Sequence, residues 1–165
     1  PNGYYVYEMK GNKVKDCYYK GTNWDKEKQM ALFRADTDLN GESYAADWNL
    51  PRDSGIIVAN VFNADSEWKV YAIENGKKTE MTRLQKTPCQ DAFAVGYHHK
   101  YAKSNVYNFF SKKNGYLKMN HWYYYQPKDP NAFITIKVVD KYGNTYTETS
   151  DHVVTEPFYN YAHYY

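Results

Sequence analysis

GIIVANVFNADSEWKVYAIENGK, residues 55–77, is the stretch that decides the fold of this chain. Residues 56–62 form an apolar run that is rich in β-branched side chains and too short for a typical helix. Turn-forming residues occupy 63–66, and residues 68–74 then alternate between two faces. Asn-Gly at 75–76 supplies the positive φ angles that a two-residue hairpin turn needs. The stretch therefore predicts an antiparallel meander at the centre of a β-rich domain.

Similar strand patterns, separated by Gly, Asn and Pro, continue on both sides of this stretch. We expect one short helical turn near 91–95 and a loop over 36–54. About ten short strands with turn signals between them predict an all-β fold, an antiparallel two-sheet β-sandwich that is immunoglobulin-like, fibronectin-like or related, with little helix. The other expected strands cover residues 4–10, 14–20, 29–35, 79–84, 106–111, 117–125, 133–139 and 145–149.

The length of 165 residues suits one domain with a real core. No fixed-period repeat or low-complexity linker divides the chain. We therefore expect a single β-sandwich domain over 1–150, and an aromatic C-terminal tail over 151–165 that packs on it or extends it. The sequence begins at Pro1 without an initiator Met or a signal peptide, which we interpret as a piece of a longer protein or a processed chain.

Composition excludes two classes of partner and draws attention to the aromatic residues. The balance of 21 basic against 19 acidic residues, a net charge of +2, predicts no nucleic-acid partner. No apolar run is long enough to predict a membrane span. The chain has 20 Tyr, 7 Phe and 4 Trp, so it must bury many rings and still leave Tyr hydroxyls at the surface, where they suit interfaces.

Metal-binding and catalytic patterns are weak. His98 and His99 are adjacent, so on an extended chain their rings point to opposite faces, and a solvated loop is the favoured interpretation. Residues 36–42, DTDLNGE, resemble the start of a calcium loop, but the closing glutamate is absent and an acidic surface loop is favoured. His121 lies within an aromatic strand and is expected to be packed or hydrogen-bonded. No nucleophile or phosphate-binding motif occurs, so we expect no catalytic, cofactor-binding or metal-binding residue and no enzyme activity from this chain by itself.

Cys17 and Cys89 leave two states open. They could form one disulfide if the protein is exported, or remain two free thiols.

An ordered set of short segments carries a family resemblance. The set resembles the C-terminal domain of calcineurin-like metallophosphoesterases, chiefly exported bacterial proteins of the Bacteroides type. The resemblance runs from Pro1 to about Thr149. Its segments are PNGY (1–4), GN (11–12), YKG (19–21), QM (29–30), IIVANVFNADSEWKV (56–70), ENGKKTEMTR (74–83) and ITIKVVDKYGNTYTE (134–148).

The resemblance implies a parent chain that hydrolyses phosphoesters. In that family a preceding catalytic domain holds a two-metal centre with Asp-x-His, Gly-Asp, Gly-Asn-His-Glu and Gly-His-x-His motifs. None of these occurs here: residues 96–99 read Gly-Tyr-His-His, and Asn120-His121 lacks the flanking Gly and Glu. The resemblance thus implies no cofactor in this chain and an exported location, periplasmic or at the cell surface.

Two functions follow as expectations. The first is a non-catalytic accessory domain that docks against or shapes the catalytic phosphoesterase domain of the same parent chain. The alternative is a carbohydrate- or glycan-binding module that uses exposed aromatic rings as stacking platforms. For either function we predict the same surface residues, Trp24 and Trp48 in loops and Trp122 and Tyr124 on a strand, with the last two as the main members of a docking face.

Overall fold

A computed structural model describes residues 3–36, 38–39, 42–43, 50–52, 54–84 and 121–154 of the chain. Regular structure in these residues is almost entirely β. The strands are β1 (Gly3–Lys10), β2 (Lys13–Gly21), β3 (Met30–Arg34), β4 (Asp38–Leu39), β5 (Glu42–Ser43), β6 (Ile57–Val61), β7 (Lys69–Glu74), β8 (Lys77–Glu80), β9 (Thr82–Arg83), β10 (Trp122–Tyr125), β11 (Ile134–Val139) and β12 (Thr145–Thr149), followed by the short 3-10 helix η3 (Ser150–His152).

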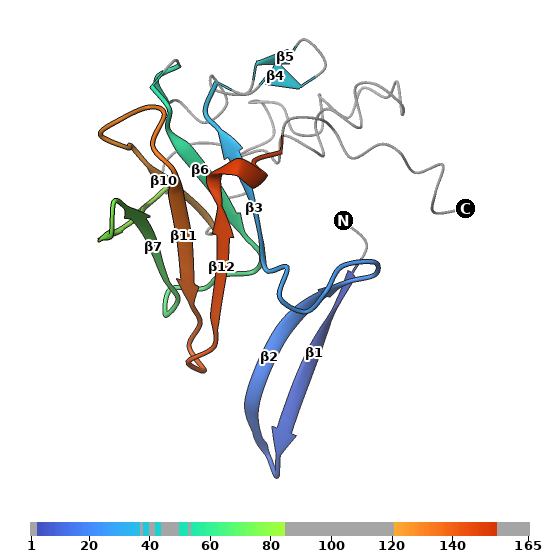
Figure 1. The fold of residues 1–165 in the computed structure, drawn as a ribbon. Coiled ribbons are helices and arrows are strands. Elements are labelled where there is room, and N and C mark those ends of the chain that lie inside the picture. Colours follow the sequence, from blue (N-terminus) through green and yellow to red (C-terminus); the bar gives the residue numbers. More distant parts are fainter. Residues whose placement is uncertain are drawn as a thin grey trace, which may run out of the picture.

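Two four-stranded antiparallel sheets form the body, with strand orders β3-β6-β10-β9 and β12-β11-β7-β8. The predicted all-β, two-sheet antiparallel fold is therefore confirmed. Strands β1 and β2 form a separate two-stranded sheet, which projects from one end of the body (Figure 1). A short β4–β5 hairpin lies within the stretch predicted to be a loop.

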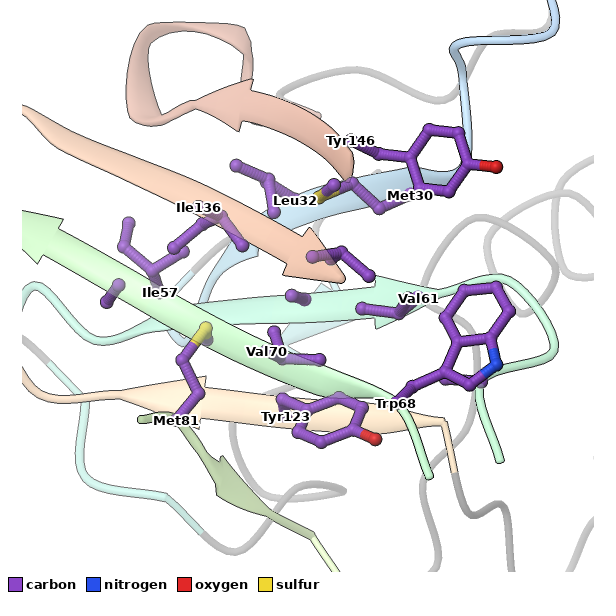
Figure 2. Close-up of a cluster of buried hydrophobic side chains, with 14 of the residues drawn as sticks. Met30, Leu32, Ile57, Val61, Trp68, Val70, Met81, Tyr123, Ile136 and Tyr146 are labelled. Carbon is purple, nitrogen blue, oxygen red and sulfur yellow. The ribbon is translucent and has the colours of Figure 1, made fainter. Parts of the chain in front are cut away.

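The main core lies between the two sheets, and most of its side chains are aliphatic (Figure 2). Strand β11 shows why: its residues alternate strictly, with Ile134, Ile136 and Val138 fully buried. Val70 and Ala72 of β7 face the same core, as their alternation predicted. Trp68 and Tyr123 close one end of this layer.

A second cluster of buried side chains covers the other face of the β3–β6–β10 sheet. Its members are Phe33, Ala35, Ile56, Val58, Leu84, Trp122 and Val154. Because this sheet is covered on both faces, all five residues of β6 are buried.

The structure corrects the predicted meander. Residues 75–76 do form the tight turn between β7 and β8, with φ values of 49° and 76°. However, β6 pairs with β3 and β10, whereas β7 pairs with β8 and β11, so the segment between β6 and β7 crosses from one sheet to the other. The predicted strand 79–84 is likewise divided: β8 belongs to one sheet and β9 to the other. Apolar patterns identify strands, but they do not say which strand is the hydrogen-bonding partner.

Glu74 is a buried carboxylate that holds the β10–β11 connection against the end of β7. The Tyr125 hydroxyl donates to it over 2.7 Å, and the backbone N–H groups of Lys128 and Asp129 donate over 3.1 and 3.3 Å. The Tyr125 hydrogen bond, followed by the two backbone bonds, lowers the pKa of Glu74 below its ordinary value of 4.5.

We expect Glu74→Gln to lower the free energy of unfolding at neutral pH. We also expect this free energy to fall less steeply in the variant as the pH is lowered. A carboxyl group with a lowered pKa in the folded state stabilises the fold above pH 4.5, and this stabilisation is lost as the pH falls through the lowered value. Urea denaturation at a series of pH values checks this. Glu80→Gln is the matched control, since Glu80 lies on the adjacent strand with its side chain 62% exposed. Equal pH profiles for Glu74→Gln and the wild type would contradict the assignment.

Candidate functional site

The β1–β2 hairpin is the part of the described structure with the most exposed apolar surface. Gly11 makes the turn with a φ of 61°, as the Gly-Asn pair predicted. The register runs from Gly3 opposite Gly21 to Lys10 opposite Lys13, with a bulge that leaves Lys15 unpaired. Opposite residues point to the same face, so the sequence sorts the hairpin into two chemically different faces.

One face of the hairpin carries no charged side chain. We call it the apolar face, and its residues are Tyr5, Tyr7 and Met9 of β1 and their partners Tyr19, Cys17 and Val14 of β2. The reverse face carries Tyr4, Glu8 and Lys20 among others. Glu8 and Asp16 form ion pairs with Lys15 and Lys26, at 2.8 and 3.8 Å. The hairpin is therefore amphipathic, although it projects away from the core.

Several side chains of the apolar face are exposed to an extent unusual for large apolar groups. Tyr5 is 40% exposed, Tyr7 57%, Met9 54% and Val14 40%. The ring centroids of Tyr5 and Tyr7 lie 5.8 Å apart, and those of Tyr5 and Tyr19 6.1 Å apart. Partial burial, then the neighbouring Cys17, Tyr7 and Tyr19, raise the pKa of Tyr5 to about 12, so its hydroxyl is neutral at physiological pH. This face combines ring surface with neutral hydroxyl donors.

Gln29 holds the inner edge of the hairpin, the edge of β2 that does not pair with β1, to the body. Its side-chain amide donates to the carbonyls of Tyr19 and Lys26, both over 2.6 Å, and its side-chain oxygen accepts from the Tyr19 N–H over 3.3 Å. The Gln29 side chain is fully buried and thus takes the place of a neighbouring strand for one residue of β2. As a result β2 is the inner strand of the hairpin and β1 the outer one (Figure 1).

A second contact joins the hairpin to the turn between β11 and β12. The Asn144 side chain donates to Asp16 over 2.7 Å and to Asp140 over 2.9 Å. Asp140 is buried, and it also accepts from the backbone N–H groups of Tyr142 and Asn144 at 2.8 Å. Gln29 and Asn144 thus both attach the hairpin to the body along its inner edge.

Trp24 belongs to a row of aromatic contacts that leads from the hairpin into the body. Tyr19 meets Phe62 with 5.6 Å between ring centroids, and Trp24 stacks on Phe62 at 5.6 Å and an interplanar angle of 17°. Trp24 is half-buried, and one face of its indole is covered by Phe62. The ring supports the base of the hairpin, and one of its faces is closed to sugar stacking.

The other predicted surface residues do not form a common site with Trp24. Trp122 has no exposed surface and packs against Phe33 with 5.8 Å between ring centroids, so its predicted place on an exposed docking face is wrong. Trp122 and Tyr124 do lie on the opposite face of β10 from Tyr123, as the alternation predicted, but the second cluster of buried side chains covers that face. Tyr124 is half-buried against that cluster, and its docking role stays a prediction. Trp48 lies outside the described residues.

Sequence analysis did not predict the exposed residues of the apolar face, because it chose mainly tryptophans, two of them in loops, as candidate surface residues. A signal was present: residues 4–9, Tyr-Tyr-Val-Tyr-Glu-Met, place large apolar groups on both faces of a strand that starts the chain. The face with Tyr5, Tyr7 and Met9 has no charged residue to turn toward water, and a hairpin partner pairs with the edge of a strand without covering its faces.

The remaining candidates have structural surroundings. The His121 ring lies 2.7 Å from the Asn60 side-chain oxygen, as expected for a packed, hydrogen-bonded histidine. Cys17 carries a free thiol, while Cys89, His98 and His99 and the predicted elements at 91–95 and 106–111 lie outside the described residues. Among the residues described, no three His, Cys, Asp or Glu side chains gather closely enough to hold a metal ion. The described part also contains no helix long and apolar enough to cross a membrane.

Fold and surface together define an all-β sandwich domain that carries a projecting, amphipathic hairpin. A family described as the C-terminal part of calcineurin-like phosphoesterases matches residues 1–146, nearly the whole chain, and the chain belongs to this family. No curated protein and no solved structure gave a significant match.

Proposed function

We propose that this chain is a non-catalytic accessory domain that packs against the catalytic domain of a calcineurin-like phosphoesterase. The observation that carries the proposal is the family match over residues 1–146, because the family is described as the C-terminal part of calcineurin-like phosphoesterases. On this proposal the hydrolysis, and any two-metal centre, belong to the catalytic domain. The family resemblance further supports an exported parent, which fractionation of the producing cells would test.

The use of polar side chains in the described structure supports this division of roles. Gln29 and Asp140 are buried, and their side chains form hydrogen bonds to backbone groups. Glu74 binds backbone N–H groups, and the Ser150 hydroxyl accepts from the Ile134 N–H over 3.0 Å. These side chains form the hydrogen bonds that backbone groups in turns and at strand ends need, as buried polar groups of a structural domain do.

The test compares three proteins: the full-length product that contains this sequence, the same product without this domain, and the 165-residue chain alone. Each is supplied with Mn²⁺ and assayed for hydrolysis of p-nitrophenyl phosphate and bis-p-nitrophenyl phosphate. We expect turnover from the full-length product and only buffer background from the 165-residue chain. Turnover that scales with the concentration of the 165-residue chain would overturn the proposal, as would a full-length product without a phosphoesterase domain.

A further inference from the structure

We propose that the apolar face of the β1–β2 hairpin is the surface through which this domain docks on the catalytic domain of the same polypeptide. The inference rests on the proposed function and specifies its contact surface. Its central residues are Tyr5, Tyr7 and Met9 on the outer strand.

The apolar face is not needed for the core of this domain. The two core clusters contain residues from β3 and the later strands, and none from β1 or β2. A two-stranded hairpin is at best marginally stable in water, and three or more strands or a packed face are normally required. Here the contacts to the body that the structure describes involve β2, through Gln29, Asn144 and the Tyr19–Phe62 ring contact, while Tyr7 and Met9 of β1 stay more than half exposed. Exposed apolar surface of this kind typically marks an interaction site.

The chemistry of the face fits a protein surface. Tyr and Met are enriched at the buried centres of protein interfaces, and Lys and Glu are depleted there. The apolar face has three tyrosines and a methionine and no charge, whereas Glu8, Lys10 and Lys20 lie on the reverse face. The hairpin can therefore bury one face against a partner and keep the other in water.

The position of the hairpin in the chain favours the catalytic domain as occupant. Strand β1 starts at Gly3, at the beginning of the segment that matches the family. In a protein that has a phosphoesterase domain before this segment, the connecting chain leads directly into β1. A partner joined to β1 in the same polypeptide stays near the hairpin at a raised effective concentration, an advantage that a second copy or a glycan lacks.

Hydroxyl-radical footprinting tests the proposal, because Tyr and Met side chains are readily oxidised when exposed. The full-length product is compared with the 165-residue chain. We expect oxidation of Tyr5, Tyr7 and Met9 to be about tenfold slower in the full-length product, the protection given by an opening free energy of about 1.4 kcal/mol. Two exposed rings are matched controls and should react equally in both proteins: Tyr4, 57% exposed on the reverse face, and Phe133, 60% exposed on the body.

Variants then show whether the protected residues cause docking. In the full-length product, Tyr5→Ser with Tyr7→Ser should restore oxidation of Met9 to the rate in the 165-residue chain and speed proteolysis between the domains. Tyr4→Ser should do neither. The same double variant in the 165-residue chain should retain its circular dichroism spectrum, since neither ring contributes to the core clusters.

Four results would overturn the inference. Protection at another surface would move the docking site and leave the proposed function intact. Equal oxidation rates at every residue in both proteins would show that the domains do not pack together, and this would overturn the proposed function as well. Protection of Met9 that grows with the concentration of the 165-residue chain would identify a second copy as the occupant. Protection of Met9 by a soluble oligosaccharide mixture, without protection in the full-length product, would identify a glycan site.

Discussion

Replacing Trp122 by alanine should lower the free energy of unfolding of this chain by about 3–5 kcal/mol, the usual effect of removing a buried Trp or Phe side chain. Among the described residues Trp122 is the largest fully buried side chain, and it packs in one cluster with Phe33 and Leu84 on the outer face of β10. The cavity left by the indole cannot be filled by rearrangement of strands that pair on both sides of β10.

Urea denaturation of the 165-residue chain measures this effect. Phe133→Ala is the matched control, because Phe133 is 60% exposed and its removal should change the unfolding free energy by only about 0.5 kcal/mol. If Trp122→Ala unfolds at the same urea concentration as the wild type, the indole lies at the surface, as the sequence alone suggested.

Gln29→Ala should have the second largest effect, about 2–3 kcal/mol, because it removes a fully buried amide and leaves partly buried backbone groups of Tyr19 and Lys26 without their bonds to it. The loss should fall on the hairpin in particular, since Gln29 replaces a neighbouring strand for β2. Amide hydrogen exchange should therefore become faster in β1 and β2 than in β11.

Gln126→Ala is the control for this substitution. Gln126 is exposed and donates to the Ser54 carbonyl over 2.7 Å, so its loss removes a hydrogen bond without burying an unsatisfied group. If Gln29→Ala speeds exchange equally in every strand, the amide stabilises the whole domain, and its particular role in holding the hairpin is wrong.

Local features of the fold were predictable because they depend on neighbouring residues. The alternation of Ile134, Ile136 and Val138 identifies the inward face of β11. The positive φ angle at Gly11 follows from a Gly-Asn turn, and that at Gly76 from an Asn-Gly turn. The family resemblance also came from ordered segments of sequence, and the family match over residues 1–146 confirms it.

Features that depend on distant residues were not predictable. Whether residues 56–62 pair with 68–74 depends on β3, β10 and β11, which compete for the same strand edges. The burial of Trp122 depends on Ile56, Leu84 and Val154, which are separated widely in sequence. The exposed surface of the hairpin could be recognised only with the knowledge that β1 and β2 form a separate sheet and that Gln29 holds β2 by its edge.

Calorimetry of the full-length product tests the central claim, that this domain packs on a phosphoesterase domain through its hairpin. We predict that the domain unfolds at a higher temperature in the full-length product than as the 165-residue chain, by about 2–4 °C for each 1 kcal/mol of docking energy. Tyr5→Ser with Tyr7→Ser should abolish this difference while leaving the unfolding temperature of the 165-residue chain unchanged. The same unfolding temperature in both proteins, or a difference that survives the double variant, would contradict the claim.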